Sequence, residues 1–196
     1  MVLGLTGGIG CGKSAALAMF ARLGFNAVDA DQLARSVLVR PDIVRELFLR
    51  WGQEALGADG LPDRAWIGRK VFAAPAELAF LEALLHPEVA RLRQAAVADL
   101  TRHHVVEIPL LFEKGLEAEY DCVVCVACSD DIRLTRLEAR GLSRQDAQGR
   151  INSQMPLMHK VAKSRYVLWN DGDLSALEAQ VKRLVARLAA TDKSTI

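Results

Sequence analysis

Gly7-Gly8-Ile9-Gly10-Cys11-Gly12-Lys13-Ser14 is the stretch that decides the fold. It fits the phosphate-binding pattern Gly-x-x-x-x-Gly-Lys-Ser/Thr at every position. Its glycines let successive backbone N–H groups curl around a phosphate chain, because no Cβ atom blocks the close approach. Lys13 adds a positive charge for the outer phosphates, and the Ser14 hydroxyl suits a Mg²⁺ ion. The octapeptide predicts that the chain binds a nucleoside triphosphate.

The residues on either side of this loop favour a strand before it and a helix after it. Residues 2–6 are a short apolar run of the buried-strand type, and residues 14–23 favour a helix that Gly24 is suited to end. A strand, a glycine loop and a helix in this order direct a helix N-terminus at an anion. This context separates the loop from an ordinary glycine-rich turn.

The charge of the chain is balanced, with 25 Lys and Arg residues against 24 Asp and Glu residues. No overall basic field therefore indicates nucleic-acid binding. A length of 196 residues is sufficient for one sizeable domain with insertions. The sequence has no secretion signal, and no apolar run reaches membrane-spanning length. We expect a cytoplasmic protein that binds neither nucleic acid nor membrane, with a monomer favoured.

Near-continuous apolar runs joined by helical stretches are typical of a parallel sheet with both faces covered. After residues 2–6, such runs recur at 25–29, 105–108, 122–127 and 166–169. The predicted fold class is therefore α/β, with a doubly wound, five-stranded parallel sheet.

Three cysteines in and directly after the fourth run, Cys122, Cys125 and Cys128, have a spacing that occurs in iron–sulfur ligand sets. Side chains alternate between the two faces of a strand, so residues three apart point in opposite directions. We interpret these cysteines as small, reduced, buried core residues, which agrees with a cytosolic protein. The histidines show no metal-ligand spacing, and we expect three of them at the surface: His103, His104 and His159.

Two connections are longer than a simple crossover requires. The first, residues 31–102, has helical spacing over four stretches: 42–51, 63–72, 76–86 and 88–102. We interpret Pro87 as the start of the last of these helices and His86-Pro87 as a helix boundary. The segment is interpreted as a helical insert that holds a second substrate.

The second long connection, residues 136–165, is rich in cations: Arg136, Arg140, Arg144, Arg150, Lys160, Lys163 and Arg165. For most of these cations a solvated helical hairpin is the simplest interpretation. The alternative is a mobile lid that closes arginines over the transferred phosphate. Arg136 and Arg140 are four residues apart and share a helix face, as two arginines directed at one triphosphate would.

Carboxylates and an apolar turn follow the predicted strands. Asp29 and Asp31 come at the sheet edge where open α/β folds bind ligands. One of them can accept the proton of an attacking hydroxyl, or Asp29 can cap the next helix. Glu107 suits a water-mediated metal contact or a plain edge carboxylate. Residues 109–113, Pro-Leu-Leu-Phe-Glu, either pack in the core or form a wall for an apolar or stacked part of a substrate.

Together these residues resemble one family, the dephospho-coenzyme A kinases. The landmarks follow the order of that family and span nearly the whole chain: Thr6 to Ser14, Asp29-Ala30-Asp31 with Ala34-Arg35, Arg64 with Ile67 and Val71-Phe72, Leu85-His86-Pro87, Pro109 to Glu113, Arg136 with Arg140, Arg150-Ile151 with Gln154, and Asn170. Many proteins share the phosphate loop. The Pro-Leu-Leu-Phe-Glu run and the Asp-Ala-Asp element in this order are far more selective.

The resemblance implies a kinase of P-loop type in three parts. These are a nucleotide-binding core (residues 1–30, 103–135 and 166–196), a helical coenzyme A-binding domain (31–102) and a lid (136–165). It implies transfer of the γ-phosphate of ATP to the ribose 3′-hydroxyl of dephospho-coenzyme A, the last step of coenzyme A synthesis, with Mg²⁺ as cofactor.

The resemblance also implies roles for particular residues. Asp31 is the general base, with Lys13 and Arg140 as further catalytic residues. The ATP-binding set surrounds the triphosphate: Gly8, Ile9, Gly10, Cys11, Gly12, Lys13, Ser14, Ala15, Arg136 and Arg140. The acceptor-binding set is Thr6, Asp31, Arg64, His86, Pro109, Leu110 and Leu111. Ser14 binds Mg²⁺, with Glu107 as a further contact through water.

The sequence departs from the family at three positions. The family usually has Ser at position 11 and Thr at position 15, where this chain has Cys11 and Ala15, and Pro62 replaces the usual Leu. The loop acts mainly through its backbone, so we expect Cys11 to be tolerated. The missing hydroxyl at Ala15 removes one α-phosphate contact, worth about 1 kcal/mol as a net hydrogen bond.

Two other functions are compatible with the phosphate loop alone. A nucleoside monophosphate or small-metabolite kinase has the same core but a shorter acceptor insert than residues 31–102. A non-catalytic GTP-dependent switch protein normally carries an Asn-Lys-x-Asp guanine-binding tetrapeptide, which this sequence lacks.

Overall fold

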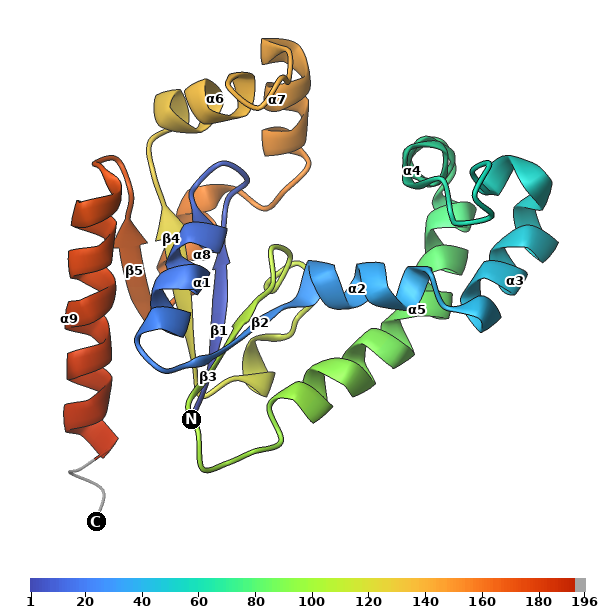
Figure 1. Cartoon of the computed structure of the whole chain (residues 1–196). Coiled ribbons are helices and arrows are strands. Elements are labelled where there is room, and N and C mark those ends of the chain that lie inside the picture. Colours follow the sequence, from blue (N-terminus) through green and yellow to red (C-terminus); the bar gives the residue numbers. More distant parts are fainter. Residues whose placement is uncertain (193–196) are drawn as a thin grey trace. The chain divides into compact units, whose positions relative to one another are not determined.

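The computed structural model describes residues 1–192 and divides into two compact units (Figure 1). The first unit contains Met1–Asp29 and the chain from Asp99 onward, and the second contains Ala30–Ala98. Residues 193–196, the end of the predicted core segment 166–196, lie outside the described residues.

The first unit is built around a five-stranded sheet in which every pairing is parallel. Its strands are β1 (Val2–Gly7), β2 (Asn26–Asp29), β3 (His104–Glu107), β4 (Cys122–Ala127) and β5 (Tyr166–Trp169). Their order in the sheet is β2-β3-β1-β4-β5. The register pairs Leu5 with Glu107 and Asp29 with Glu107, so the carboxyl ends of β1, β2 and β3 meet at one edge. The predicted parallel α/β sheet is confirmed.

Helices cover both faces of this sheet. They are α1 (Lys13–Arg22), α6 (Asp130–Glu138), α7 (Arg144–Asn152), α8 (Leu157–Lys163) and α9 (Leu174–Asp192), with a short 3₁₀ turn, η2 (Glu117–Glu119). In Figure 1, α1 and α9 lie on one face, and α8 lies on the other against β1 and β4. Fully buried apolar side chains such as Leu5, Phe20 and Val126 fill the core between these layers.

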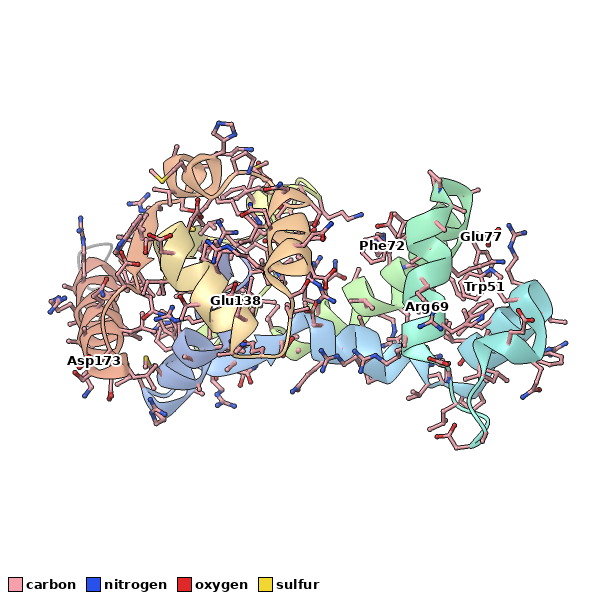
Figure 2. The ribbon with its side chains drawn as sticks, turned by 90° about the horizontal axis from the view of Figure 1, so that it is seen from above. Trp51, Arg69, Phe72, Glu77, Glu138 and Asp173 are labelled. Carbon is pink, nitrogen blue, oxygen red and sulfur yellow. The ribbon has the colours of Figure 1, made fainter. Side chains whose placement is uncertain are left out.

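The second unit consists of helices packed around an apolar cluster. Its elements are α2 (Ala30–Leu38), α3 (Pro41–Trp51), η1 (Gly52–Ala55), α4 (Arg64–Ala73) and α5 (Pro75–Ala96). The buried cluster consists of Val37, Leu38, Ile43, Leu47, Ile67 and Val71. Figure 2 shows Trp51 beside Glu77, where the indole N–H donates to the Glu77 carboxylate at 2.6 Å.

One predicted boundary in this unit is wrong. The stretches 76–86 and 88–102 were expected as two helices, but α5 continues through Pro87 from Pro75 to Ala96. Proline removes one helical hydrogen bond and bends the helix, and α5 changes direction along its length in Figure 1. Ala83, whose carbonyl loses the partner, is exposed, so water can replace the missing N–H. Packing of α5 against α2 and α4 holds the helix together.

Within the described part of the chain, we find no helix with the length and apolar character that a membrane crossing requires.

Candidate active site

The phosphate loop connects the end of β1 to the start of α1. Gly12 precedes the helix in the left-handed conformation, with a φ of 96° that favours glycine. A Cβ atom there would also lie 2.3 Å from Nδ2 of Asn170, so the position has no room for a side chain. The loop therefore places its last residues directly at the N-terminus of α1, which attracts anions.

Two carbonyl groups of the loop are held by side-chain donors. The Lys13 ammonium donates to the Gly8 carbonyl at 3.1 Å, and the Asn170 amide donates to the Cys11 carbonyl at 2.8 Å. A loop that binds an anion must present its N–H groups, so its carbonyls have to be satisfied elsewhere. Lys13 and Asn170 are both buried and supply that satisfaction. The role of Asn170 was not apparent from the sequence.

A cavity of about 310 Å³ lies beside the loop. It is lined by Gly12, Ala15, Arg136, Arg140, Asn170, Gly172, Asp173 and Leu174. Among the described residues, no partner lies within hydrogen-bond reach of the buried Nη1 of Arg136. A buried cationic donor without a partner is costly, so this atom marks a place for an anionic or acceptor group of a ligand.

Arg136 and Arg140 both line this cavity, but they do not lie on one helix face as the sequence predicted. Because α6 ends at Glu138, Arg140 does not share a helix face with Arg136 but lies in the turn that follows. Both arginines nevertheless line the cavity together with Ala15. Arg140 is exposed, whereas Arg136 is half-buried.

Ser14 and Glu107 place two oxygen ligands at the start of α1. The Ser14 hydroxyl lies 3.5 Å from Oε1 of Glu107, which is buried at the end of β3. Hydroxyl and carboxylate oxygens are the ligands that Mg²⁺ prefers, directly or through water. The donor set therefore fits a magnesium ion beside the loop.

Cys11 lies at the base of the loop and is fully buried. A hydrogen bond from Cys128 outweighs the effect of burial and, with the charges of Arg133 and Lys13, lowers the pKa of Cys11 to about 7. Burial raises the pKa of Cys125 to about 12. Cys125 and Cys128 are buried and Cys122 is half-buried, in agreement with their interpretation as core residues.

The predicted acceptor turn, residues 109–113, divides into buried and exposed parts. Leu111 and Phe112 are buried in the core, while Leu110 is 38% exposed. The Pro109 carbonyl accepts hydrogen bonds from the Thr6 hydroxyl at 3.4 Å and from the Lys160 ammonium at 2.7 Å. Core packing therefore explains Leu111 and Phe112, and the Pro109 carbonyl is occupied by Thr6 and Lys160, whereas the Leu110 side chain remains available to a ligand.

Lys160 is an exception to the interpretation that most cations of residues 136–165 are solvated. Its side chain is fully buried and pairs with the Glu113 carboxylate at 2.8 Å. Glu113 also accepts the Met155 N–H at 3.0 Å. Burial raises the pKa of Glu113, but the hydrogen bonds from Lys160 and Met155 outweigh this and hold it below its ordinary value. The pair fixes the end of the acceptor turn.

The remaining predicted site residues belong to the second unit. Asp31 lies in the first turn of α2, two residues after the end of β2, and its side chain is exposed. Arg64 begins α4 and is exposed, directly after Asp63, whose carboxylate caps that helix. His86 is exposed within α5. The loop, both arginines, Thr6 and the acceptor turn belong to the first unit.

Comparisons with known proteins agree on one family. The family model described as dephospho-CoA kinase matches residues 1–176. A dephospho-CoA kinase of Syntrophotalea carbinolica is 43% identical over 195 residues, which is 96% of this chain and 92% of that protein. The crystal structure of TT1252 from Thermus thermophilus is similar, with a TM-score of 0.85, 37% identity, and coverage of 96% and 97% of the two chains. A dephospho-CoA kinase from Campylobacter jejuni shares the fold, with a TM-score of 0.73, 24% identity, and coverage of 97% and 98%.

Proposed function

The chain belongs to the dephospho-CoA kinase family, and from this membership we propose that it transfers the γ-phosphate of ATP to the ribose 3′-hydroxyl of dephospho-CoA. It is a kinase of coenzyme A synthesis. The observation that carries the proposal within the structure is the phosphate loop, whose carbonyls are held by Lys13 and Asn170 beside a cavity with a buried, unpartnered arginine nitrogen.

We assign the nucleotide to the first unit. The loop amides and the N-terminus of α1 receive the triphosphate, and Lys13 adds charge at its outer end. Arg136 and Arg140 line the adjoining cavity, where they are suited to stabilise the charge that develops on the transferred group. Ala15 lines the same cavity, at the position where a hydroxyl contact to the α-phosphate is missing.

Asp31 is assigned as the general base. Its side chain is exposed in the first turn of α2, two residues after the carboxyl end of β2. In this role it accepts the proton of the 3′-hydroxyl as that oxygen attacks the γ-phosphorus. Arg64, His86, Thr6, Pro109, Leu110 and Leu111 are assigned to the acceptor, with Leu111 contributing through its backbone.

Ser14, with Glu107 through water, would hold Mg²⁺, because their oxygens lie together at the start of α1. A bound Mg²⁺ neutralises charge on the β- and γ-phosphates. We further propose that the protein acts in the cytoplasm as a monomer, without nucleic-acid or membrane partners. The four free cysteines support a reducing compartment.

The direct test offers several acceptors side by side in a coupled ADP-release assay. Dephospho-CoA, adenosine, AMP, CMP and shikimate are compared at equal concentration with ATP and Mg²⁺. We expect ADP release with dephospho-CoA at a rate far above the other four. Faster turnover of CMP, AMP or shikimate would refute the assigned acceptor, and the product's phosphate position is read by ³¹P NMR.

Replacement of Asp31 by Asn tests the base. ATP binding should stay near normal while turnover collapses, because Asn cannot accept the proton. Asp42→Asn is the matched control, since Asp42 is also an exposed aspartate in the first turn of a helix of the same unit. Equal activity of Asp31→Asn and the parent enzyme would remove Asp31 from this role.

Replacement of Arg140 by Ala tests the stabilising charge. Arginines that neutralise a transferring phosphoryl group contribute ~10³-fold or more to turnover, and we expect a loss of that size. Arg144→Ala is the control, because Arg144 is a neighbouring exposed cation that pairs with Glu138. A loss below about tenfold would identify Arg140 as a surface cation.

A further inference from the structure

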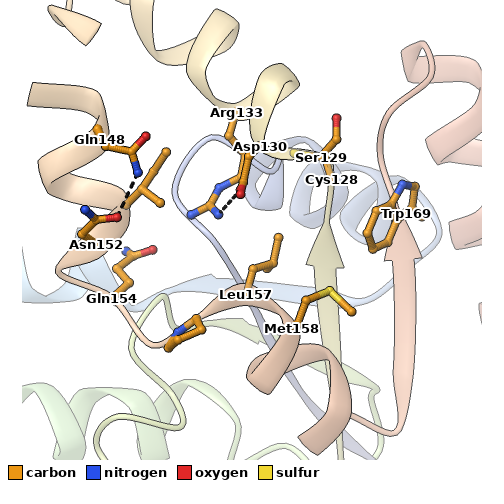
Figure 3. A pocket seen from close by; sticks show the side chains of 12 residues that line it. Cys128, Ser129, Asp130, Arg133, Gln148, Asn152, Gln154, Leu157, Met158 and Trp169 are labelled. Carbon is orange, nitrogen blue, oxygen red and sulfur yellow. Dashed lines mark hydrogen bonds and ion pairs between the residues drawn. The ribbon is translucent and has the colours of Figure 1, made fainter. Parts of the chain in front are cut away.

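The two peptide groups that flank Ile9 in the phosphate loop are held by residues that are distant in sequence. Its N–H donates to Oε1 of Gln154 at 2.9 Å, and its carbonyl accepts from Nε of Arg133 at 3.2 Å. Arg133 belongs to α6, and Gln154 follows the end of α7. Figure 3 shows both side chains on the wall of a cavity of about 550 Å³ that α6, α7 and α8 enclose.

Arg133 is fixed tightly against the loop. Its side chain is only 4% exposed, and its guanidinium pairs with the Asp130 carboxylate at 2.8 Å. A Cβ atom on Gly8 would lie 2.9 Å from its terminal nitrogen Nη2, so the guanidinium packs directly against the loop backbone and would have to shift if position 8 carried a side chain. A movement of either the loop or the guanidinium would therefore displace the other.

These contacts complete the pattern of satisfied carbonyls in the loop. Gly8, Ile9 and Cys11 direct their carbonyls to Lys13, Arg133 and Asn170, respectively. The Ile9 N–H donates to Gln154 and the Cys11 N–H donates to the Gly8 carbonyl at 3.2 Å, so neither of these two amides is directed at a phosphate. Lys13 and Gln154 hold the Gly8–Ile9 peptide group at its carbonyl and at its N–H, which fixes the plane of that group. Arg133 holds the carbonyl of the next peptide group, and together these contacts set the direction of the amides that follow.

Gln154 also stands beside the residues that fix the acceptor turn. The next residue, Met155, donates its N–H to the Glu113 carboxylate at 3.0 Å, and Lys160 donates to the same oxygen. The chain between α7 and α8 therefore contacts the phosphate loop through one residue and the acceptor turn through the next.

We propose that Arg133 and Gln154 are positioning residues that clamp the backbone on both sides of Ile9 and thereby orient the loop amides that follow toward the triphosphate. This inference rests on the proposed function of the loop in binding ATP. We expect the two residues to affect the affinity for the nucleotide and not the rate of the chemical step. Gln154 supplies the acceptor for the Ile9 N–H, and Arg133 supplies the donor for the Ile9 carbonyl.

The test compares Gln154→Met with Gln148→Met. Both replace a neutral amide on the wall of the same cavity by a side chain of similar length, but the Gln148 amide donates to Asn152 within α7 instead of accepting from the phosphate loop. Gln154→Met should raise the KM for ATP and the Kd for ADP about tenfold, the effect of one net hydrogen bond, with kcat nearly unchanged. Gln148→Met should leave both constants at the parent values.

Gln154→Glu tests the chemistry of the clamp, because it keeps an acceptor oxygen at the same position. We expect it to bind ADP more tightly than Gln154→Met does. Arg133→Lys, which keeps a donor, should likewise bind ADP more tightly than Arg133→Met. Equal ADP affinity of Gln154→Met and the parent would overturn the proposal, as would an equal loss in Gln154→Met and Gln148→Met.

Calorimetry with ADP separates this proposal from the proposed function. The ADP titrations need no acceptor, so they measure the clamp even if the parent enzyme fails to phosphorylate dephospho-CoA. A parent enzyme that binds ADP but does not use dephospho-CoA would refute the assigned reaction and leave the clamp standing. If the parent enzyme phosphorylates dephospho-CoA but Gln154→Met binds ADP as tightly as the parent, the assigned reaction stands and the clamp is refuted.

Discussion

The two units of this protein differ in whether their charged side chains are buried or exposed. The structure buries eight polar or charged residues among those it describes, and seven of them belong to the first unit, with Arg93 in the second. The ion pairs of the second unit instead involve partly exposed arginines, such as Arg40 with Asp42 and Arg50 with Glu77. Its interior is an apolar cluster around Leu47.

This difference indicates where backbone position matters most. A buried charge is tolerated only when a partner and hydrogen bonds replace the lost water. In the first unit those bonds end on the backbone of the phosphate loop or of the acceptor turn, as for Lys13, Arg133 and Lys160. In the second unit apolar packing fixes the helices and leaves Asp31, Arg64 and His86 exposed.

The largest effect on stability is expected from Lys160→Met. Removing one partner of a buried ion pair leaves the other charge uncompensated, and about 3–5 kcal/mol of unfolding free energy is lost in such cases. Urea unfolding followed by Trp169 fluorescence measures the change, in a background where Trp51 and Trp66 are Phe. These two tryptophans belong to the second unit, so the remaining signal reports on the first.

Lys163→Met is the control for Lys160→Met. Lys163 is three residues further along α8, 48% exposed, and paired with Glu117 at 3.3 Å on the surface. We expect its urea midpoint to stay close to that of the parent. Similar midpoints for the two variants would show that burial of the Lys160 charge has no special importance, and the contrast between the units would lose its strongest support.

The sequence allows the sheet and the loop to be predicted, because both depend on local patterns. The run Cys122 to Ala127 has the same bounds in the structure. The predicted helix 63–72 is α4 (Arg64–Ala73), which starts one residue later because Asp63 is its cap. Pro87 was misjudged, since a proline ends a helix only when packing does not hold both halves. His104 was expected at the surface but is buried, with its ring bonded to Asn26 and to the Asp99 carbonyl.

The buried cations could not be located from spacing alone, because their partners are distant in sequence. Arg133 is 124 residues from Ile9, and Lys160 is 51 residues from Pro109. One local signal was present, since each cation lies on the apolar face of its helix. Arg133 is followed by Leu134 and Leu137, which are buried, and Lys160 lies three residues after buried Leu157. A Lys or Arg on the apolar face of a predicted helix therefore indicates a buried cation with a hydrogen-bonded partner.

The second prediction tests whether apolar packing is as important to the second unit as paired charge is to the first. Leu47→Ala removes a fully buried side chain of α3 and should cost about 3 kcal/mol through lost burial and the cavity left behind. Urea unfolding measured by the fluorescence of Trp51 and Trp66, in a background where Trp169 is Phe, gives the change in unfolding free energy. ADP affinity should remain at the parent value, and a weakened affinity would contradict independent roles for the two units.

The third prediction concerns the pH dependence of the Glu113–Lys160 pair. The pKa of Glu113 lies below its ordinary value of 4.5, so its ionised form is favoured by folding. A depressed carboxyl pKa adds stability that is complete above the unfolded value and disappears as the pH falls through the folded value. The difference in unfolding free energy between the parent and Glu113→Gln should therefore be constant above about pH 5.5 and shrink as the pH falls below 4.5. A difference that persists unchanged at the lowest pH would exclude the charge of Glu113 as its source.

The smallest change in unfolding free energy is expected when an exposed ion pair of the second unit is removed. Arg40 and Asp42 are 40% and 59% exposed, and the hydrogen bond from Arg40 lowers the pKa of Asp42 without removing either group from water. Exposed pairs are screened by solvent and salt, so Asp42→Asn should change the extrapolated unfolding free energy by less than the usual error of about 10–15%. Measurement in low and high NaCl sharpens the comparison, because any residual difference should vanish with salt. A large, salt-independent loss would mean that the helical unit also depends on fixed charge, and the distinction between the two units would then fail.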